Sequence, residues 1–240
     1  MKPVSTVSII PLEHLVLVFI PVLLVTGVFY WWSLKTGTVF YAFFRMLVQL
    51  MLVGYVLLWI FAVEYAWVVL SLVTIMALIS TWIALRTIPR HRSALYLVTL
   101  LSILLGGGGV LLLVTRWVLD LEPWYQPNFF IPLAGMIFSN SMNGVSLAAD
   151  RLQSELVVAN YAKARAGALH TALIPLVNSL FAVGLVALPG MMTGQILSGV
   201  SPLIAARYQI MVMCMLFGAA GLSTILFLCF SRRYFESQPT

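Results

Sequence analysis

Long apolar runs, separated by short polar stretches, make up most of the chain. A helix crosses a hydrocarbon core of about 30 Å with about twenty apolar residues. Seven runs approach or exceed this length. The pattern therefore predicts an all-α, polytopic membrane protein with about seven transmembrane helices in a single domain over residues 1–240. The expected spans are 12–32, 39–63, 66–85, 94–117, 129–149, 167–187 and 203–230.

One break in this pattern stands out, between Leu188 and Gly199, where the sequence reads LPGMMTGQILSG. The stretch leaves the helical pattern, yet it stays largely apolar. In lipid, non-helical backbone survives only where it is buried in protein or lines a cavity. We therefore expect residues 188–202 to form a re-entrant segment beside a pathway.

The composition excludes a soluble protein, because 62% of the residues are hydrophobic, only 8% are charged and the mean hydropathy is +1.06. The net charge of +6 is scattered through short loops beside apolar spans. Such charges are typical of orientation signals that face membrane lipids, and they do not indicate a nucleic-acid partner. Cys214 and Cys229 lie in one apolar run, which indicates neither a disulfide framework nor a zinc site.

Loop charges predict the orientation of the chain in the membrane. The side that holds the loops after the first, third and fifth spans and the C-terminal tail is strongly basic, whereas the other side carries Lys2 and Arg116. By the positive-inside rule, the N-terminus is outside and the C-terminus is cytoplasmic. Residues 188–202 then lie on the outer side. The basic residues expected in the cytoplasm are Lys35, Arg86, Arg90, Arg92, Arg151, Lys163, Arg165, Arg232 and Arg233.

Polar side chains and methionines inside the spans are candidates for a substrate pathway. Met136, Asn140 and Asn143 share one helical face, and Asn178 shares a face with Pro175 in the next span. Such side chains either form packing contacts between helices or line a pathway. With the residues of the break, the candidate pathway set is Met136, Asn140, Asn143, Asn178, Met191, Met192 and Gln195.

The identity of any metal ligand stays open at this point. Met211 and Met215 share a face of the last span, and thioethers suit copper(I), whereas iron(II) and manganese prefer nitrogen and oxygen ligands. Methionine also fills gaps in ordinary cores. Because no His or carboxylate accompanies these residues, the metal ligands are unknown.

The sequence carries no hydrolytic or redox motif, since G-x-S-x-G, H-E-x-x-H and a Walker A loop are all missing. We therefore expect a protein that is not an enzyme and that binds no cofactor itself. Any ATP hydrolysis has to be supplied by another chain.

Three strings carry a family resemblance: PLAGMIFSNSMNG (132–144), ALIPLVNSLFAVGLVALPGMMTGQILSGVSP (172–202) and ARYQIMVMCMLFGAAGLSTI (206–225). They resemble the bacterial iron-export ABC transporter permease family, whose plant relatives act in aluminium tolerance. The resemblance implies a multi-pass permease of the bacterial inner membrane that pairs with a second copy of itself. It also implies a separate cytoplasmic ATPase, which binds ATP and Mg²⁺, and export of a metal ion, with iron the best supported.

One segment departs from the family pattern. DRLQSEL stands at 150–156 and ALIP at 172–175, so the cytoplasmic stretch 157–171 is shorter than in the family and lacks its Leu-Gly-Ala-Thr-like turn. Either a shorter element contacts the ATPase, or the chain is a deletion variant that folds but transports poorly. The alternative interpretation of the charges in this region is a solvated loop that faces the headgroups. The residues expected at an ATPase contact are Asp150, Arg151, Glu155, Lys163 and Arg165.

An ATP-independent ion channel or carrier is the alternative function. Those mechanisms usually need ionisable residues deep in the membrane. Here Glu64 is expected at an interface, and Arg45 and Arg207 lie near span ends. The sequence therefore favours the permease.

Overall fold

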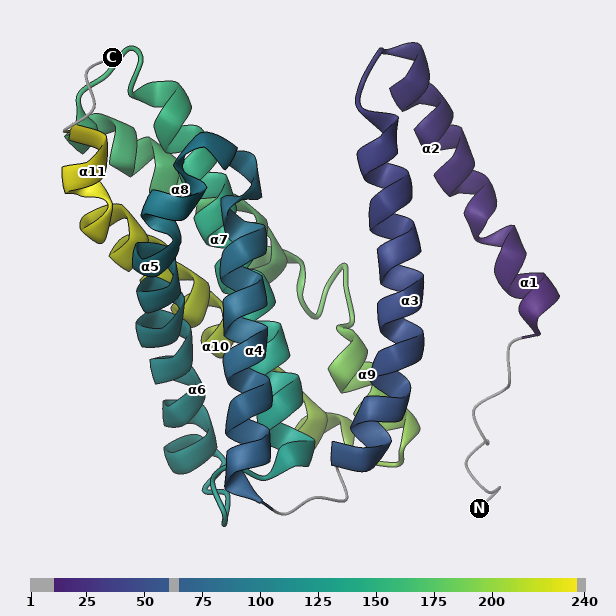
Figure 1. Ribbon diagram of the computed structural model, residues 1–240. Helices are drawn as coiled ribbons and strands as arrows, with labels where there is room; N and C mark the ends of the chain where they lie inside the picture. The colour runs from purple at the N-terminus through teal and green to yellow at the C-terminus, as the bar shows by residue number, and fades with distance from the viewer. Residues whose placement is uncertain (1–10, 61–64, 237–240) are drawn as a thin grey trace. The chain divides into compact units, whose positions relative to one another are not determined.

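The computed structural model describes residues 11–60 and 65–236, and its regular secondary structure over these ranges is helical. The chain divides into two compact units, Met1–Ala62 and Val63–Thr240, which are described separately below (Figure 1). Lys2, Glu64 and the expected end of the second span at residue 63 lie outside the described residues.

Among the described residues, five helical segments are long and apolar enough to cross a membrane. Two further helices, α7 (Pro127–Glu155) and α8 (Tyr161–Ala182), are equally long but more polar. The all-helical, multi-pass architecture is thus confirmed, whereas the count of seven spans and the orientation of the termini stay predictions. The five segments are Glu13–Trp31, Thr36–Val56, Ala66–Thr87, Arg92–Val118 and Pro202–Phe230.

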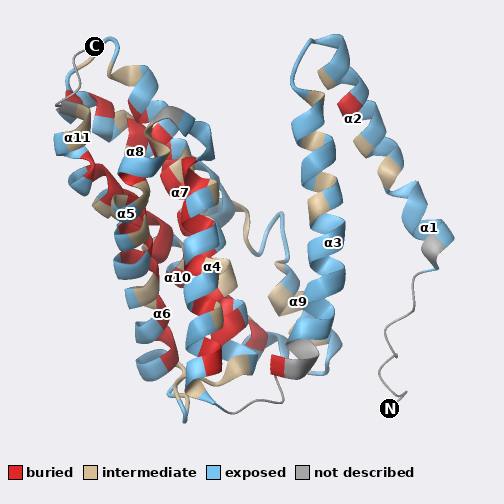
Figure 2. Ribbon diagram, in the orientation of Figure 1, coloured by how far each residue is buried: buried red, intermediate tan, exposed pale blue. Residues whose placement is uncertain are grey.

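The first unit is a helical hairpin with an apolar, exposed surface. A turn at Ser33, whose φ is +57°, joins its last two helices, and the Leu34 N–H donates to the Phe29 carbonyl at 2.8 Å. Most side chains along the hairpin stay exposed (Figure 2). Helices that are apolar all round are suited to a lipid environment. The helices are α1 (Leu12–Leu17), α2 (Phe19–Trp31) and α3 (Thr36–Ile60).

The second unit is a bundle in which α7 and α10 (Pro202–Phe230) pack against each other and against most of the other helices. One continuous helical segment, with two π-helical turns, covers the expected span 94–117. Its parts are α5 (Arg92–Ile103), η3 (Leu104–Gly108), α6 (Gly109–Leu113) and η4 (Val114–Val118). The other elements are α4 (Ala66–Ala84), η1 (Leu85–Thr87), η2 (Pro89–His91), α9 (Gly190–Leu197) and α11 (Arg232–Glu236).

Small residues hold α7 and α10 together. The Ser223 hydroxyl donates to the Ser141 hydroxyl at 3.1 Å within the core. A Cβ atom at Gly144 would lie 2.7 Å from the Thr224 hydroxyl, so a larger residue there would displace that hydroxyl. In membranes, such residues let helix backbones approach closely and gain dispersion energy and hydrogen bonds. Buried residues accordingly follow this contact (Figure 2).

The π-helical turn η3 makes a second close contact with α10. A Cβ atom at Gly106 would lie 2.5 Å from the Ser223 backbone nitrogen, whereas Gly109 faces open space. Within the run of four glycines at 106–109, Gly106 is thus the position that allows close approach to the α10 backbone.

The connections between helices of the second unit lie at its two ends (Figure 1). One end holds the α4–α5 connection, the α7–α8 hairpin and α11. A hydrogen bond of 2.9 Å between His91 Nδ1 and the Tyr234 hydroxyl joins the α4–α5 connection to α11. The end of η4 and the start of α10 lie at the opposite end. Of the loops expected on the cytoplasmic side, those that belong to the second unit thus lie at one end of its bundle.

Two expected boundaries are corrected. The break at 188–202 is not free of helix, because α9 occupies Gly190–Leu197. Pro189, with φ at −63°, precedes its first turn, and Gly199, with φ at +90°, follows its last. In addition, α8 ends at Ala182 instead of residue 187. The expected re-entrant position of the segment stays a prediction.

We expect the Gly106→Ala substitution to lower the free energy of unfolding by about 1–3 kcal/mol, because the added methyl forces η3 away from α10. Thermal unfolding in detergent, followed by tryptophan fluorescence, measures the change. Gly109→Ala is the matched control, since its Cβ enters open space and alanine is the better helix former. Equal melting temperatures for the two variants would contradict this packing.

Candidate functional site

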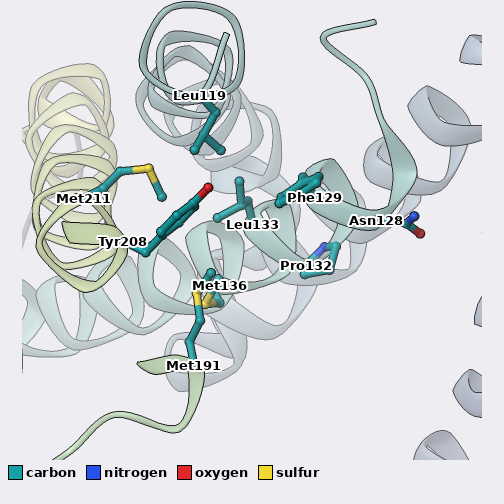
Figure 3. A pocket seen from close by; sticks show the side chains of 9 residues that line it. All are labelled: Leu119, Asn128, Phe129, Pro132, Leu133, Met136, Met191, Tyr208 and Met211. Atoms are coloured by element: carbon teal, nitrogen blue, oxygen red, sulfur yellow. The ribbon is translucent and has the colours of Figure 1, made fainter. Parts of the chain in front are cut away.

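A cavity of about 270 Å³ lies among α7, α9 and α10, and we call it the first cavity. Three methionines line it: Met136 from α7, Met191 from α9 and Met211 from α10 (Figure 3). Met136 and Met191 extend toward each other from their two helices, and the Tyr208 ring enters from α10. The cavity therefore brings together two of the residues predicted from sequence, Met136 and Met191.

Helical periodicity explains how α7 builds one wall. Phe129, Pro132, Leu133 and Met136 stand at i, i+3, i+4 and i+7, so they share one face of α7. Met191 is the second residue of α9 and directly follows the turn that Pro189 begins. The position of α9 therefore determines whether Met191 lies opposite the residues of α7 that line the cavity.

The chemistry of this cavity is apolar and soft. Apart from Tyr208 and Asn128, its lining side chains are hydrocarbon or thioether. Thioethers bind soft metal ions, and an apolar constriction excludes hydrated hard ions. Within residues 11–60 and 65–236, no cluster of three His, Cys, Asp or Glu side chains could hold a metal ion. The cavity is therefore suited to gating rather than to holding a hard metal ion.

Met192 lines a different cavity, of about 330 Å³, which shares no lining residue with the first. We call it the second cavity. It lies among the end of α8, α9 and α10, where Gln209, Met213 and Cys214 also line it. Neighbouring residues on a helix point in different directions, so the adjacent methionines serve separate cavities.

The other predicted pathway residues line neither of the two cavities. The Asn140 amide donates to the Met136 carbonyl of its own helix at 2.9 Å. Asn143 and Asn178 are exposed. Gln195 is half-buried on α9, and its amide oxygen has no hydrogen-bond partner in the described part of the chain.

The residues expected at an ATPase contact lie on the α7–α8 hairpin. Arg151 and Glu155 form an ion pair of 2.6 Å, and α7 continues through both. Asp150, Lys163 and Arg165 are exposed. The expected loop after residue 149 is thus largely helical, because the ion pair supports the last turn of α7 and the Asn160 side chain caps the first turn of α8.

The tip of this hairpin is short and apolar. Residues 156–160 join the two helices, and Val157 and Val158 are 78% and 86% exposed there. The Tyr161 hydroxyl donates to the Leu228 carbonyl and fixes the start of α8 on α10. The Glu155 carboxylate lies against Gly167, where a Cβ would be 2.6 Å from Oε1. The hairpin is therefore well anchored below an exposed apolar tip.

Sequence reasoning missed the contribution of Tyr208 and Met211 to the first cavity. Both follow Pro202 at the start of α10, and their i, i+3 spacing places them on one face. That spacing could have indicated that Tyr208 and Met211 line the same surface. The pairing of this face with Met136 of α7 depends on helix rotation, which periodicity within one helix does not determine.

Comparison with known proteins places the chain in a family. The family described as uncharacterised protein family UPF0014 matches residues 12–162 and 158–235. The chain belongs to the UPF0014 family. No solved structure matches it.

UPF0014 relatives occur in bacteria and plants. A UPF0014 membrane protein of Synechocystis is 37% identical over 79% of this chain and 80% of its own length. The Escherichia coli protein named "Probable iron export permease protein FetB" is 35% identical over 76% of this chain and 75% of its own length. The Arabidopsis thaliana protein ALUMINUM SENSITIVE 3 is 34% identical over 79% and 74% of the two chains. The expected resemblance to iron-export permeases and plant aluminium-tolerance proteins is thereby confirmed.

The UPF0014 match comes in two parts that overlap at residues 158–162. This overlap falls at the tip of the α7–α8 hairpin and at the start of α8. The family pattern is thus interrupted within the stretch 157–171, where the sequence departs from the family.

Placement of α9 can be tested by cross-linking. In a C214S/C229S background, we expect a short bismaleimide to join M136C to M191C at least about tenfold faster than M136C to M192C, because only the first pair lines one cavity. Loss of free thiols on a polyethylene-glycol-maleimide gel measures the reaction. Equal rates for the two pairs would show that α9 is rotated differently.

Proposed function

We propose that this chain is the membrane permease subunit of an ABC transporter that exports iron from the bacterial cytoplasm. In this proposal, two copies of the chain form the membrane part, and a separate cytoplasmic ATPase binds ATP and Mg²⁺ and supplies the energy. The observation that carries it is the similarity to the probable iron export permease of Escherichia coli over three quarters of both chains.

The α7–α8 hairpin supports the proposed ATPase contact. Its tip exposes Val157 and Val158, while Asp150, Lys163 and Arg165 lie exposed on the adjoining turns. An apolar centre within a polar rim is the usual composition of a protein interface. The tip lies at the same end of the second unit as the basic α4–α5 connection. This is the end that the loop charges assign to the cytoplasm.

The first cavity supports a gate on the exit side. Its wall of thioethers and hydrocarbon offers a hydrated iron ion almost no polar contact, so an ion passes only when α9 or α10 moves. Such movement requires a second state that the partner stabilises by differential binding. ATP binding in the proposed ATPase supplies that difference.

Transport by reconstituted vesicles tests the proposal. The tagged chain is purified with the ATP-hydrolysing subunit that it retains, and both are placed in vesicles with the ATPase facing outward. We expect iron(II) to accumulate inside with ATP and to stay outside when the ATPase subunit cannot hydrolyse ATP. Manganese, copper and zinc are measured in parallel.

Two outcomes would overturn the proposal. Passive iron leakage through the chain alone would favour the ATP-independent channel or carrier. ATP-driven movement of another metal without iron would exclude the iron assignment while retaining the permease.

The hairpin tip has a test of its own. We expect Val158→Asn to reduce ATP hydrolysis that depends on the permease by about tenfold, because the polar amide weakens an apolar anchor at the centre of an interface. Val186→Asn is the matched control, since Val158 and Val186 are both 86% exposed and Val186 lies in the turn that follows α8. An equal loss of ATP hydrolysis in both variants would show that the hairpin tip is not a specific contact for the ATPase.

A further inference from the structure

The second cavity differs from the first in the polar atoms that it contains. Gln209, Met213 and Cys214 line it from α10, and Met192 lines it from α9. Its remaining lining residues are aliphatic or glycine. One amide, two thioethers and one thiol therefore converge on a cavity of about 330 Å³.

Gln209 is the informative residue of this group. Its side chain is buried, with 5% of the residue exposed, and its amide oxygen has no hydrogen-bond partner in the described part of the chain. Burial of an oxygen that lacks a hydrogen-bond partner is unfavourable, and this cost is removed when a ligand contacts the oxygen. A ligand of the cavity should therefore carry positive charge or a hydrogen-bond donor.

The sulfur atoms narrow the class of ligand. Thioether and thiolate sulfur are soft donors, which select copper(I) among biological metals and also bind silver(I). Cys214 is a free thiol, so its sulfur is available as a ligand. We propose that the second cavity is a binding site for a monovalent soft cation, copper(I) or silver(I), with Met192, Met213 and Cys214 as sulfur ligands and the Gln209 oxygen as a weak fourth contact.

Charge balance favours a monovalent ion over a divalent one. When the ion binds, the Cys214 S–H bond breaks, a sulfur–metal bond forms and the proton leaves to solvent. A monovalent cation and one thiolate then make a neutral pair. A divalent ion would leave one uncompensated positive charge, and no acidic side chain lines the described part of this cavity. Such a charge is costly in a membrane interior.

This site goes beyond the proposed iron transport, because it has a different location and a different class of ion. Its lining residues are separate from those of the first cavity. Binding here is measured without an ATPase and without transport, so failure of the iron assay leaves this inference intact.

The test is silver(I) titration of the purified full-length chain in detergent and chloride-free buffer, followed by calorimetry. Cys229 is also a free, exposed thiol and binds silver on its own, so every variant carries Cys229→Ser. In this background we expect one tightly bound ion, and at least about tenfold weaker binding in Met213→Leu and in Cys214→Ser. Met215→Leu is the matched control, since Met215 belongs to α10 but does not line the cavity. It should bind silver as the background chain does.

Proton release gives an independent readout. In the Cys229→Ser background, silver binding should release about one proton per ion, and none after Cys214→Ser. Unchanged affinity in both Met213→Leu and Cys214→Ser, or an equal loss in Met215→Leu, would overturn the site. Zinc(II) binding as tight as silver(I) binding would contradict the assignment of the cavity to a monovalent ion. If substitutions on α10 alter the size-exclusion profile, the affinity of Met192→Leu, on α9, for silver decides whether the site exists. The proposed site predicts weaker binding in that variant.

Discussion

Close packing of small residues around α10 is the contact on which the second unit depends. Gly106 lets η3 approach the backbone of α10, and Gly144 lets α7 approach the Thr224 side chain of α10. The Ser223 hydroxyl of α10 also donates a buried hydrogen bond to Ser141 of α7. Lipid supplies no hydrophobic force that drives apolar helices together, so such close contact has to supply the association energy. Because α10 carries Tyr208, Met211 and Met213, its position also sets the walls of both cavities.

Much of the helical architecture follows from the sequence, because apolar length and loop polarity are local properties. The break at Leu188 was correctly identified as a departure from a spanning helix, but Gly190–Leu197 is itself helical. Short helices of this kind depend on the turns that flank them, and Pro189 and Gly199 were the local signals for it. Apolar content alone gave no reason to place a helix there.

The candidate site was only partly predictable for a different reason. Met136 and Met191 were recognised as unusual side chains in or beside a span, and they do line one cavity. Spacing also grouped Asn140 and Asn143 with Met136, yet the structure leaves Asn143 exposed and satisfies the Asn140 amide within its own helix. A shared helical face spans a wide arc, so which of its residues meets a neighbour depends on tertiary rotation.

Continuity of α7 links the two regions on which the proposed transport depends, the first cavity and the α7–α8 hairpin. The helix runs for 29 residues, about 43 Å at 1.5 Å per residue, from the Phe129–Met136 wall of the first cavity to Glu155 at the hairpin. Glu155 is held by Arg151 and by close contact with Gly167, so α7 and α8 pack together at that end. In the proposed transporter, a force that the ATPase applies to the hairpin tip would act on a continuous helix whose far end lines the first cavity. The proposed coupling needs no longer element, because the tip joins α7 and α8 directly.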